Sequence, residues 1–336
     1  MRKLVLILIS LLLAVSLPAH SEDFDMTEVI FEHIGDSYEW HIATFGDTDV
    51  SIYLPVIVRG SETGWHVFSS RHLYKDGEWE GFHIAPSGAA NEGKIVAADG
   101  TRPLDISITK NVLSLIMSSI LLAILILLTA RWYKRHDPTR EAPSGIAAYM
   151  EPVVMMVHEM ARENIGEDYR RFSPYLITAF TFILLNNFMG IIPIFPGGAN
   201  LTGNIAITLV LALITFLTFM LNGTRHFYGE MLNPDVPIFL KPIMPVIEIF
   251  SNLIRPVSLT IRLFANMLAG HIQIISVVLL IFIMAKYGPL MCGGMTVVSV
   301  GFGLFLDALE LLISFIQAYV FTMLSSIYIG LARAKE

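Results

Sequence analysis

The sequence has little charge and almost no cysteine. Of its 336 residues, 15% are charged and 54% are hydrophobic, and Cys292 is the single cysteine. One cysteine excludes an internal disulfide framework and a cysteine-based metal cluster. The formal net charge of -7 leaves no face rich in Lys and Arg, which argues against nucleic acid as a partner. A composition this apolar is typical of membrane proteins.

The charges are also unevenly distributed. Residues 22–105 hold many of the acids and three of the four tryptophans, Trp40, Trp65 and Trp79. Most of the remaining chain consists of hydrophobic runs. The predicted fold class is an all-α polytopic membrane protein with about five membrane helices in the mature chain, preceded by a small β-rich domain outside the cytoplasm.

The first 21 residues have the pattern of a secretory signal peptide. Arg2 and Lys3 form the charged region, and residues 4–17 form an apolar stretch that is too short to span a membrane comfortably. Small residues follow in Ala19-His20-Ser21, where a signal peptidase would cut. The alternative is an uncleaved signal anchor.

Residues 22–108 form the predicted β-rich domain. Residues 51–54 and 65–68 look like short strands, and Asp76-Gly77 predicts a hairpin turn. Five histidines lie here without the spacing of helical metal ligands, so we expect surface or packing roles rather than a metal site: His33, His41, His66, His72 and His83.

Residues 109–336 form the predicted membrane domain. Residues 112–130 are its first span, and the basic residues that follow place that end in the cytoplasm by the positive-inside rule. Residues 172–192, ended by Pro193 and the loop Pro196-Gly197-Gly198, and residues 204–221 are the next spans. Between them and the first span, residues 144–166 are amphipathic and form either an interfacial helix or a plain cytoplasmic linker helix.

The last two apolar segments are too long to stand upright in a bilayer. Residues 243–284 would form a helix of roughly 60 Å, about twice the hydrocarbon thickness, and residues 296–332 pose the same problem. Such helices must tilt strongly, kink at Pro245 or Pro256, or run partly along the membrane plane.

Arg262 is the most informative residue of the sequence. A charged side chain at bilayer depth costs at least ~2.5–3.5 kcal/mol on insertion scales. A guanidinium keeps its proton, so Arg262 can attract an anion or block a cation but cannot relay protons. Either it pairs with an acid of this chain, for which Glu248, Asp307 and Glu310 are candidates, or its carboxylate partner belongs to another subunit.

Helical geometry arranges the neighbours of Arg262. Asn266 lies one turn later on the same face, whereas His271 falls about 180° around the helix. Glu248 returns to within about 40° of the arginine face, near the cytoplasmic end. Three small residues let another helix approach closely: Ala265, Ala269 and Gly270.

The last segment carries a polar stripe of Asp307, Glu310, Ser314 and Gln317, at spacings of 3, 4 and 3. Such a stripe either lines a water-filled path or proton relay, or makes hydrogen bonds between helices. A hairpin of the last two helices would bring His271 and Glu310 together, and this pair could pass protons.

Several runs resemble subunit a of the F-type ATP synthase. The strongest is Pro256-Val257-Ser258-Leu259, followed by Arg262-Leu263-Phe264-Ala265-Asn266-Met267 and Ala269-Gly270. Gln317-Ala318-Tyr319-Val320-Phe321 is similar to the family's last helix, and Asn187 fits its earlier spanning helix. The resemblance covers roughly residues 110–334, so the signal peptide and the β-rich domain lie outside the common core.

The resemblance implies a proton-conducting stator subunit of a rotary ATP synthase, without a cofactor and not an enzyme on its own. It would form two offset half-channels against a ring of c subunits and couple proton flow to ring rotation and ATP synthesis. Further implied partners are the b subunits of the peripheral stalk, the F1 sector indirectly, and the lipid bilayer. The implied location is the cell inner membrane, with a periplasmic N-terminal domain and a cytoplasmic C-terminus. Protons or sodium ions fit as the cargo, and we predict protons.

The resemblance also assigns roles by matched position. Arg262 would pair with the ring carboxylate and prevent a leak between the half-channels, supported by Asn266 and Gln317. His271 and Glu310 would line the outer half-channel, and Glu248 the cytoplasmic one. This chain departs from the family in two places. Many bacterial members have an acid at the position of His271 and a histidine at the position of Glu310. Gly190 stands where some relatives have an acid.

Two other functional classes remain open at this point. A secondary transporter would show internal repeats with paired broken helices, and none is evident. A membrane receptor with a sensing N-terminal domain would carry a C-terminal signalling module, which is not seen before Glu336.

Overall fold

The computed structural model describes residues 35–45, 48–61, 64–86, 88–89, 91–137, 140–192, 197–233, 237, 241 and 243–334. The predicted signal peptide, His33, Pro193 and Pro196 lie outside these residues. The chain divides into two compact units, residues 1–116 with 194–199 and residues 117–193 with 200–336.

The first unit contains three small antiparallel sheets in its described part. Strands β1 (Glu39–Phe45) and β2 (Thr48–Tyr53) form one sheet. The second has the order β4-β3-β8, from Gly64–Ser69, Pro55–Gly60 and Leu104–Asp105. The third has the order β5-β6-β7, from Glu78–Trp79, Phe82–Ile84 and Ile95–Ala97. This confirms the β-rich N-terminal region.

The core of this unit follows the two-residue period of its strands. Val56 and Val58 on β3 are fully buried, and they pack with buried side chains from other elements. These partners are Tyr38, Leu73, Phe82 and Ile95.

The predicted hairpin turn at Asp76-Gly77 is wrong. Residues Arg71–Lys75 form the short helix α3, and Asp76 caps its C-terminus. Gly77 has a φ of +81°, which suits the residue after a helix as well as a hairpin turn, so the dipeptide alone does not distinguish them. The tight turn lies instead between β5 and β6, where Glu80 and Gly81 have φ of 52° and 79°.

Two histidines of this unit, His66 and His72, lie beside acids and aromatic rings. The Nδ1 atom of His66 lies 2.5 Å from Glu80 Oε2, and His72 stacks on Trp79 with ring centroids 4.0 Å apart. In the part of the chain that the structure describes, no group of three or more His, Cys, Asp or Glu residues could hold a metal ion.

The second unit is helical. After α4 (Lys110–Arg135), which links the units, come α5 (Ile146–Ile165), the 3-10 turn Gly166–Asp168, α6 (Tyr169–Ile191), α7 (Ile205–Leu221), α8 (Arg225–Leu232), α9 (Met244–Ala285) and α10 (Pro289–Arg333). Among the described residues, four helical segments are long and apolar enough to cross a membrane, or five if α7 and α8, which meet at 99°, form one broken span. The predicted mostly helical fold, with about five membrane helices and a small β-rich N-terminal region, is confirmed.

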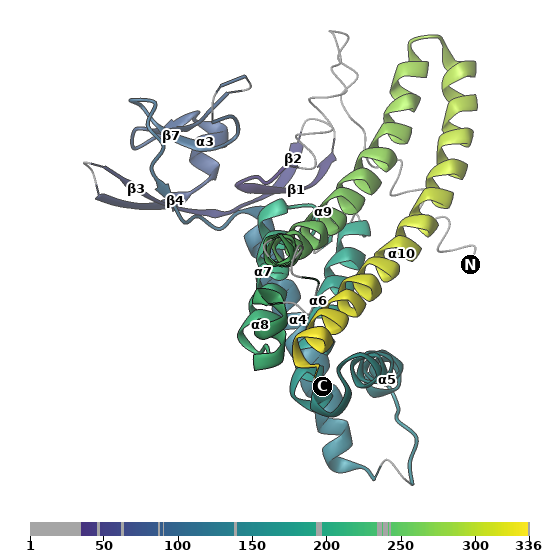
Figure 1. Cartoon of the computed structure of the whole chain (residues 1–336). Helices are drawn as coiled ribbons and strands as arrows, with labels where there is room; N and C mark the ends of the chain where they lie inside the picture. The colour runs from purple at the N-terminus through teal and green to yellow at the C-terminus, as the bar shows by residue number, and fades with distance from the viewer. Residues whose placement is uncertain are drawn as a thin grey trace. The chain divides into compact units, whose positions relative to one another are not determined.

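Helices α9 and α10 form a long hairpin (Figure 1). They contain 42 and 45 residues, and Pro256 lies inside α9 without ending it. At about 1.5 Å per residue both helices far exceed the roughly 30 Å hydrocarbon core, so neither fits upright in a bilayer.

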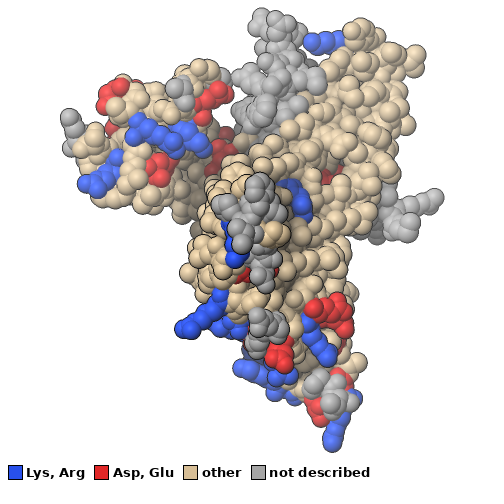
Figure 2. Space-filling view, viewed as in Figure 1, with Lys and Arg blue, Asp and Glu red and all other residues tan. Residues whose placement is uncertain are grey.

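The helical core is centred on α6, where Leu176, Phe180 and Ile183 are fully buried. They belong to a cluster that includes Phe219 of α7 and Phe321 of α10. The visible surface of the α9–α10 hairpin is almost uncharged, whereas charges of both signs gather at the lower end of the helical unit and are interspersed over the β-rich unit (Figure 2). Many large apolar side chains of α4, α7, α9 and α10 are exposed, as is typical of helices that contact lipid or other protein surfaces.

Helix α5 packs against protein along one face. Val157 and Ala161 are fully buried in the cluster shared with α6 and α10. At its C-terminal end, Asn164 Nδ2 donates to Ser326 Oγ of α10 over 2.9 Å. The amphipathic pattern of residues 144–166 is therefore largely explained by packing against neighbouring helices rather than by a free linker.

Candidate functional site

The candidate site is formed by α6, α9 and α10. Both long helices carry polar residues within otherwise apolar segments, and the helices pack side by side. The polar residues of α10 lie toward neighbouring helices, since Glu310, Ser314 and Gln317 are buried and Asp307 is half-buried. Their shared face follows from spacings close to one helical turn.

The buried stripe of α10 has many hydrogen-bonding atoms without a partner in the described structure. These are both carboxylate oxygens of Glu310, Ser314 Oγ and Gln317 Oε1. Buried polar atoms are normally paired, and each one left unpaired costs free energy. A row of such atoms along one helix can bind water or polar groups of another molecule.

The carboxylate of Glu310 lies against the backbone of α9. A Cβ atom added to Gly270 would lie 2.8 Å from Glu310 Oε1, so this glycine makes room for the carboxylate. His271, which follows Gly270, is half-buried. The hairpin thus brings Glu310 next to the Gly270–His271 segment.

Arg262 lies near the middle of α9 and is half-buried. Within the described residues, it forms no ion pair with Glu248, Asp307 or Glu310. Asn266, one turn later, is exposed, and Glu248 is half-buried in the second turn of the helix. In the described structure, therefore, no acid of its own chain pairs with Arg262.

Asn187 joins three parts of the helical unit. Its Nδ2 donates to the backbone oxygen of Ser314 on α10 over 3.3 Å, and its Oδ1 accepts from Thr202 Oγ1 over 2.7 Å. It is fully buried. Because its donor and its acceptor are both engaged, Asn187 holds the polar stripe of α10 against α6.

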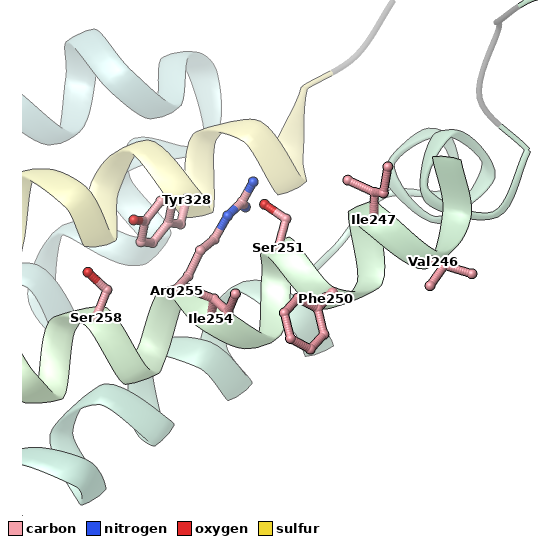
Figure 3. Close-up of a pocket in the computed structure, with 8 residues that line it drawn as sticks. All are labelled: Val246, Ile247, Phe250, Ser251, Ile254, Arg255, Ser258 and Tyr328. Carbon is pink, nitrogen blue, oxygen red and sulfur yellow. The ribbon is translucent and has the colours of Figure 1, made fainter. Parts of the chain in front are cut away.

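A pocket of about 710 Å³ lies beside the N-terminal part of α9 (Figure 3). Its polar lining consists of Ser251, Arg255 and Ser258 from α9 and Tyr328 from α10. The guanidinium carbon of Arg255 lies 4.9 Å from the centroid of the Tyr328 ring, and its Nη1 atom is buried without a hydrogen-bond partner in the described structure. This is a cation–π contact with unused donor capacity.

Three residues near the site were not predicted from the sequence: Arg255, Asn252 and Thr202. Arg255 lies seven residues, close to two turns, before Arg262, so a helical wheel places both on nearly the same face as Glu248. Asn252 is buried, and its Nδ2 donates to the thioether sulfur Sδ of Met231 over 3.7 Å. Thr202 lies in a loop, where no helical period indicates the contact with Asn187.

Comparisons with known proteins match both parts of the chain. A family model described as ATP synthase A chain matches residues 115–330, and a model described as a domain of unknown function matches residues 29–113. The chain is 36% identical to ATP synthase subunit a of Pelodictyon phaeoclathratiforme, over 99% of this chain and 94% of that protein. It is 41% identical to ATP synthase subunit a 2 of Prosthecochloris aestuarii, over 69% of this chain and 70% of that protein. Similarity to ATP synthase subunit a of Myxococcus xanthus is 39% identity over 69% of this chain and 74% of that protein.

Proposed function

The chain belongs to the ATP synthase subunit a family, and we propose that it is the proton-conducting stator subunit of a rotary ATP synthase. In this role it forms two offset half-channels against the c-subunit ring and couples proton flow to ring rotation and ATP synthesis. The observation that carries the proposal is Arg262, a half-buried charge in a 42-residue apolar helix with no acidic partner in the described part of its own chain.

Arg262 is the fixed positive charge between the half-channels. A carboxylate on a neighbouring ring subunit would lose its proton near the guanidinium, because an opposite charge within about 4–6 Å favours the ionised form. The guanidinium itself does not release a proton. It therefore holds the ring carboxylate in place and blocks direct passage of protons from one half-channel to the other. Asn266 and Gln317 support it as amide partners.

The outer half-channel runs along the α10 stripe. Glu310 and His271 exchange protons with water, and Ser314 and Gln317 extend the polar path toward the ring. The unpaired oxygens of Glu310, Ser314 and Gln317 support this role, since they are free to bind water. Asn187 keeps the stripe in position through its bond to the Ser314 backbone and carries no protons itself.

The cytoplasmic half-channel begins at the pocket beside the N-terminal part of α9. Glu248, which lies about one turn before Ser251 and outside the pocket lining, accepts or releases protons at this end of α9, and the two serines of the pocket provide hydroxyl groups for water. Arg255 contributes positive charge at this entrance, where its free Nη1 donor can orient water or the Glu248 carboxylate.

Complex formation supplies the remaining parts. We propose that the ring packs on the exposed apolar faces of α9 and α10, that b subunits contact the helical unit, and that the F1 sector is reached indirectly through them. The chain resides in the cell inner membrane with its N-terminal domain in the periplasm and its C-terminus in the cytoplasm, as the basic residues after α4 favour. The leading residues act as a cleaved signal peptide.

The test is substitution of Arg262 in the assembled complex. Arg262→Ala abolishes ATP-driven proton pumping and ATP synthesis while the ring still co-purifies. Arg170→Ala is the matched control, because Arg170 is an exposed arginine that stacks on the neighbouring Tyr169 and donates a hydrogen bond to its hydroxyl. Proton pumping at the wild-type rate by the Arg262→Ala complex would refute the proposal. So would a chain that purifies without a ring and transports a solute in liposomes.

A further inference from the structure

The sheet β4-β3-β8 has two faces of different character. One face belongs to the core of the β-rich unit, through Val56 and Val58 of β3. Helix α3 and strand β7 lie on one side of β3 and β4 (Figure 1). The cross-strand pairs of Ile57 with Val67 and of Arg59 with Trp65 and Leu104 belong to the opposite face, because directly paired residues point the same way.

This opposite face is apolar and bare. Trp65, Val67, Leu104 and Ile106 are 54%, 70%, 58% and 55% exposed. An antiparallel sheet that faces water on one side normally carries polar residues there. A contiguous apolar face of this kind marks a surface that contacts something other than water.

The bare face is joined directly to the start of a membrane helix. Ile106 N donates to Ile57 O over 3.0 Å, and Ile108 N donates to Pro55 O over 3.2 Å. Lys110, the first residue of α4, donates its backbone N–H to Ser37 O over 2.9 Å. These bonds hold the sheet to the N-terminal end of α4. The apolar surface of α4 begins there with the exposed residue Val112.

Basic groups border the same face. Ser69 continues the outward row of β4, and it lines a pocket of about 430 Å³ together with Arg71, His72, Lys75 and Asp76. On the face itself, the guanidinium carbon of Arg59 lies 5.8 Å from the centroid of the Trp65 ring. The pocket also holds an acid, since Asp76 Oδ2 lies 3.0 Å from His72 Nδ1.

We propose that this face lies on the phospholipid surface of the bilayer that α4 enters, on the side where α4 begins. Tryptophan and aliphatic side chains beside basic groups are the chemistry of a membrane interface: the apolar side chains enter the headgroup region, and Arg and Lys approach lipid phosphates. The exposed Ile106 lies only six residues before Val112, the exposed apolar residue at the start of α4, and this closeness along the chain favours the bilayer over a water-soluble partner. The inference does not depend on the proposed proton path.

Site-specific fluorescence quenching in the whole complex tests the proposal. A Cys292→Ser chain with Val67→Cys is labelled with a fluorophore and reconstituted in phosphatidylglycerol-containing vesicles. A lipid brominated close to its headgroup quenches this label, and aqueous iodide does not. The matched control is Glu92→Cys, an exposed position outside the sheet, at which iodide quenches and the brominated lipid does not. Substitution at the highly exposed Val67 leaves the core of the unit intact.

Two outcomes overturn the proposal. Quenching of the Val67→Cys label by iodide means that the face lies in water. Quenching by neither reagent means that a protein subunit covers it. A further arm tests the basic border. In vesicles with phosphatidylglycerol, adding Arg71→Gln to the labelled Val67→Cys chain lowers the lipid-contacting fraction about fivefold. If the labelled chain without Arg71→Gln shows an equal lipid-contacting fraction in vesicles with and without phosphatidylglycerol, the basic border has no role.

Discussion

Glu310 on α10 places its carboxylate against Gly270 on α9, so closely that a methyl group at Gly270 would lie 2.8 Å from Oε1. The contact joins the two long helices at the point where α9 continues into His271. The Glu310 carboxylate can take this position because Gly270, on the facing helix, has no side chain. The relationship connects helix packing to the proposed proton path.

Gly270→Ala is expected to reduce ATP-driven proton pumping by roughly 10-fold to 100-fold, because the new methyl group must displace the Glu310 carboxylate by a fraction of an ångström or more. Pumping is measured in inverted vesicles with equal amounts of assembled complex. Gly301→Ala is the control, since a Cβ at that glycine of α10 meets no atom within 4 Å. Equal activity of both variants would show that the position of Glu310 is not critical.

The His271–Glu310 pair predicts a partial rescue. Either His271→Glu or Glu310→His alone places two like groups in one polar site and should lower proton pumping strongly. The double variant restores one acid and one histidine and should retain more activity than either single variant. Their coupling is the deviation from additivity in a double-mutant cycle of pumping rates. Strictly additive losses would contradict a joint role.

Asn187→Leu is expected to destabilise the helical unit. It removes the acceptor of the Thr202 hydroxyl and the donor to the Ser314 backbone oxygen, and both groups then lack a partner in a buried site. Each lost partner costs about 1–3 kcal/mol. The readout is the midpoint of thermal dissociation of the purified complex. Thr178→Ala serves as the control, because that exposed hydroxyl bonds only to Pro174 O of its own helix. Matching midpoints in the two variants would refute the bridging role of Asn187.

Gly330→Ala should prevent close packing of α5 on α10. A Cβ at Gly330 would lie 2.0 Å from the backbone oxygen of Asn164, which cannot move without shifting α5. Overpacking of this kind costs about 1–3 kcal/mol or more, so less assembled complex should accumulate in membranes. Gly303→Ala, at an open position of α10, is the control. A normal level of the Gly330→Ala complex would mean that α5 does not pack this closely.

Tyr38 predicts a pH limit for the β-rich unit. Burial raises the pKa of its hydroxyl above the usual 10.0, and the hydrogen bond to Asp105 raises it further. The folded unit therefore holds this proton more tightly than the unfolded chain does, so stability is complete below about pH 10 and falls as pH rises above it.

The expected loss is visible in the tryptophan fluorescence of the full chain titrated through about pH 9 to 11. Tyr38→Phe should flatten this pH dependence, because it removes the ionising group. Tyr287→Phe, which changes an exposed tyrosine, should leave it in place. A pH profile that Tyr38→Phe does not alter would exclude Tyr38 as the cause.

Much of the helical architecture was predictable because the membrane imposes simple lengths. The apolar runs located α4, α6, α7, α9 and α10, and Arg262 was evident as a charge near the middle of one of them. Periodicity also predicted the shared face of Glu310, Ser314 and Gln317, since these residues lie near one-turn intervals.

Contacts between distant segments were not predictable in the same way. The bond from Thr202 to Asn187 depends on how a loop returns to α6, which no local pattern encodes. The hairpin turn predicted at Asp76-Gly77 was wrong because a glycine with positive φ ends a helix as readily as it forms a hairpin turn. The small size of Gly270 was noted, but its specific contact with Glu310 required the register of the α9–α10 hairpin.

The central claim is that the partner of Arg262 is a carboxylate of the ring. The most direct measurement is a high-resolution structure of the intact membrane complex, in which the distance from the Arg262 guanidinium to the nearest acid is determined. The account predicts a ring carboxylate within about 4–6 Å, with polar paths on either side. An Arg262 paired with Glu248 or Asp307 of its own chain, or facing lipid, would contradict it.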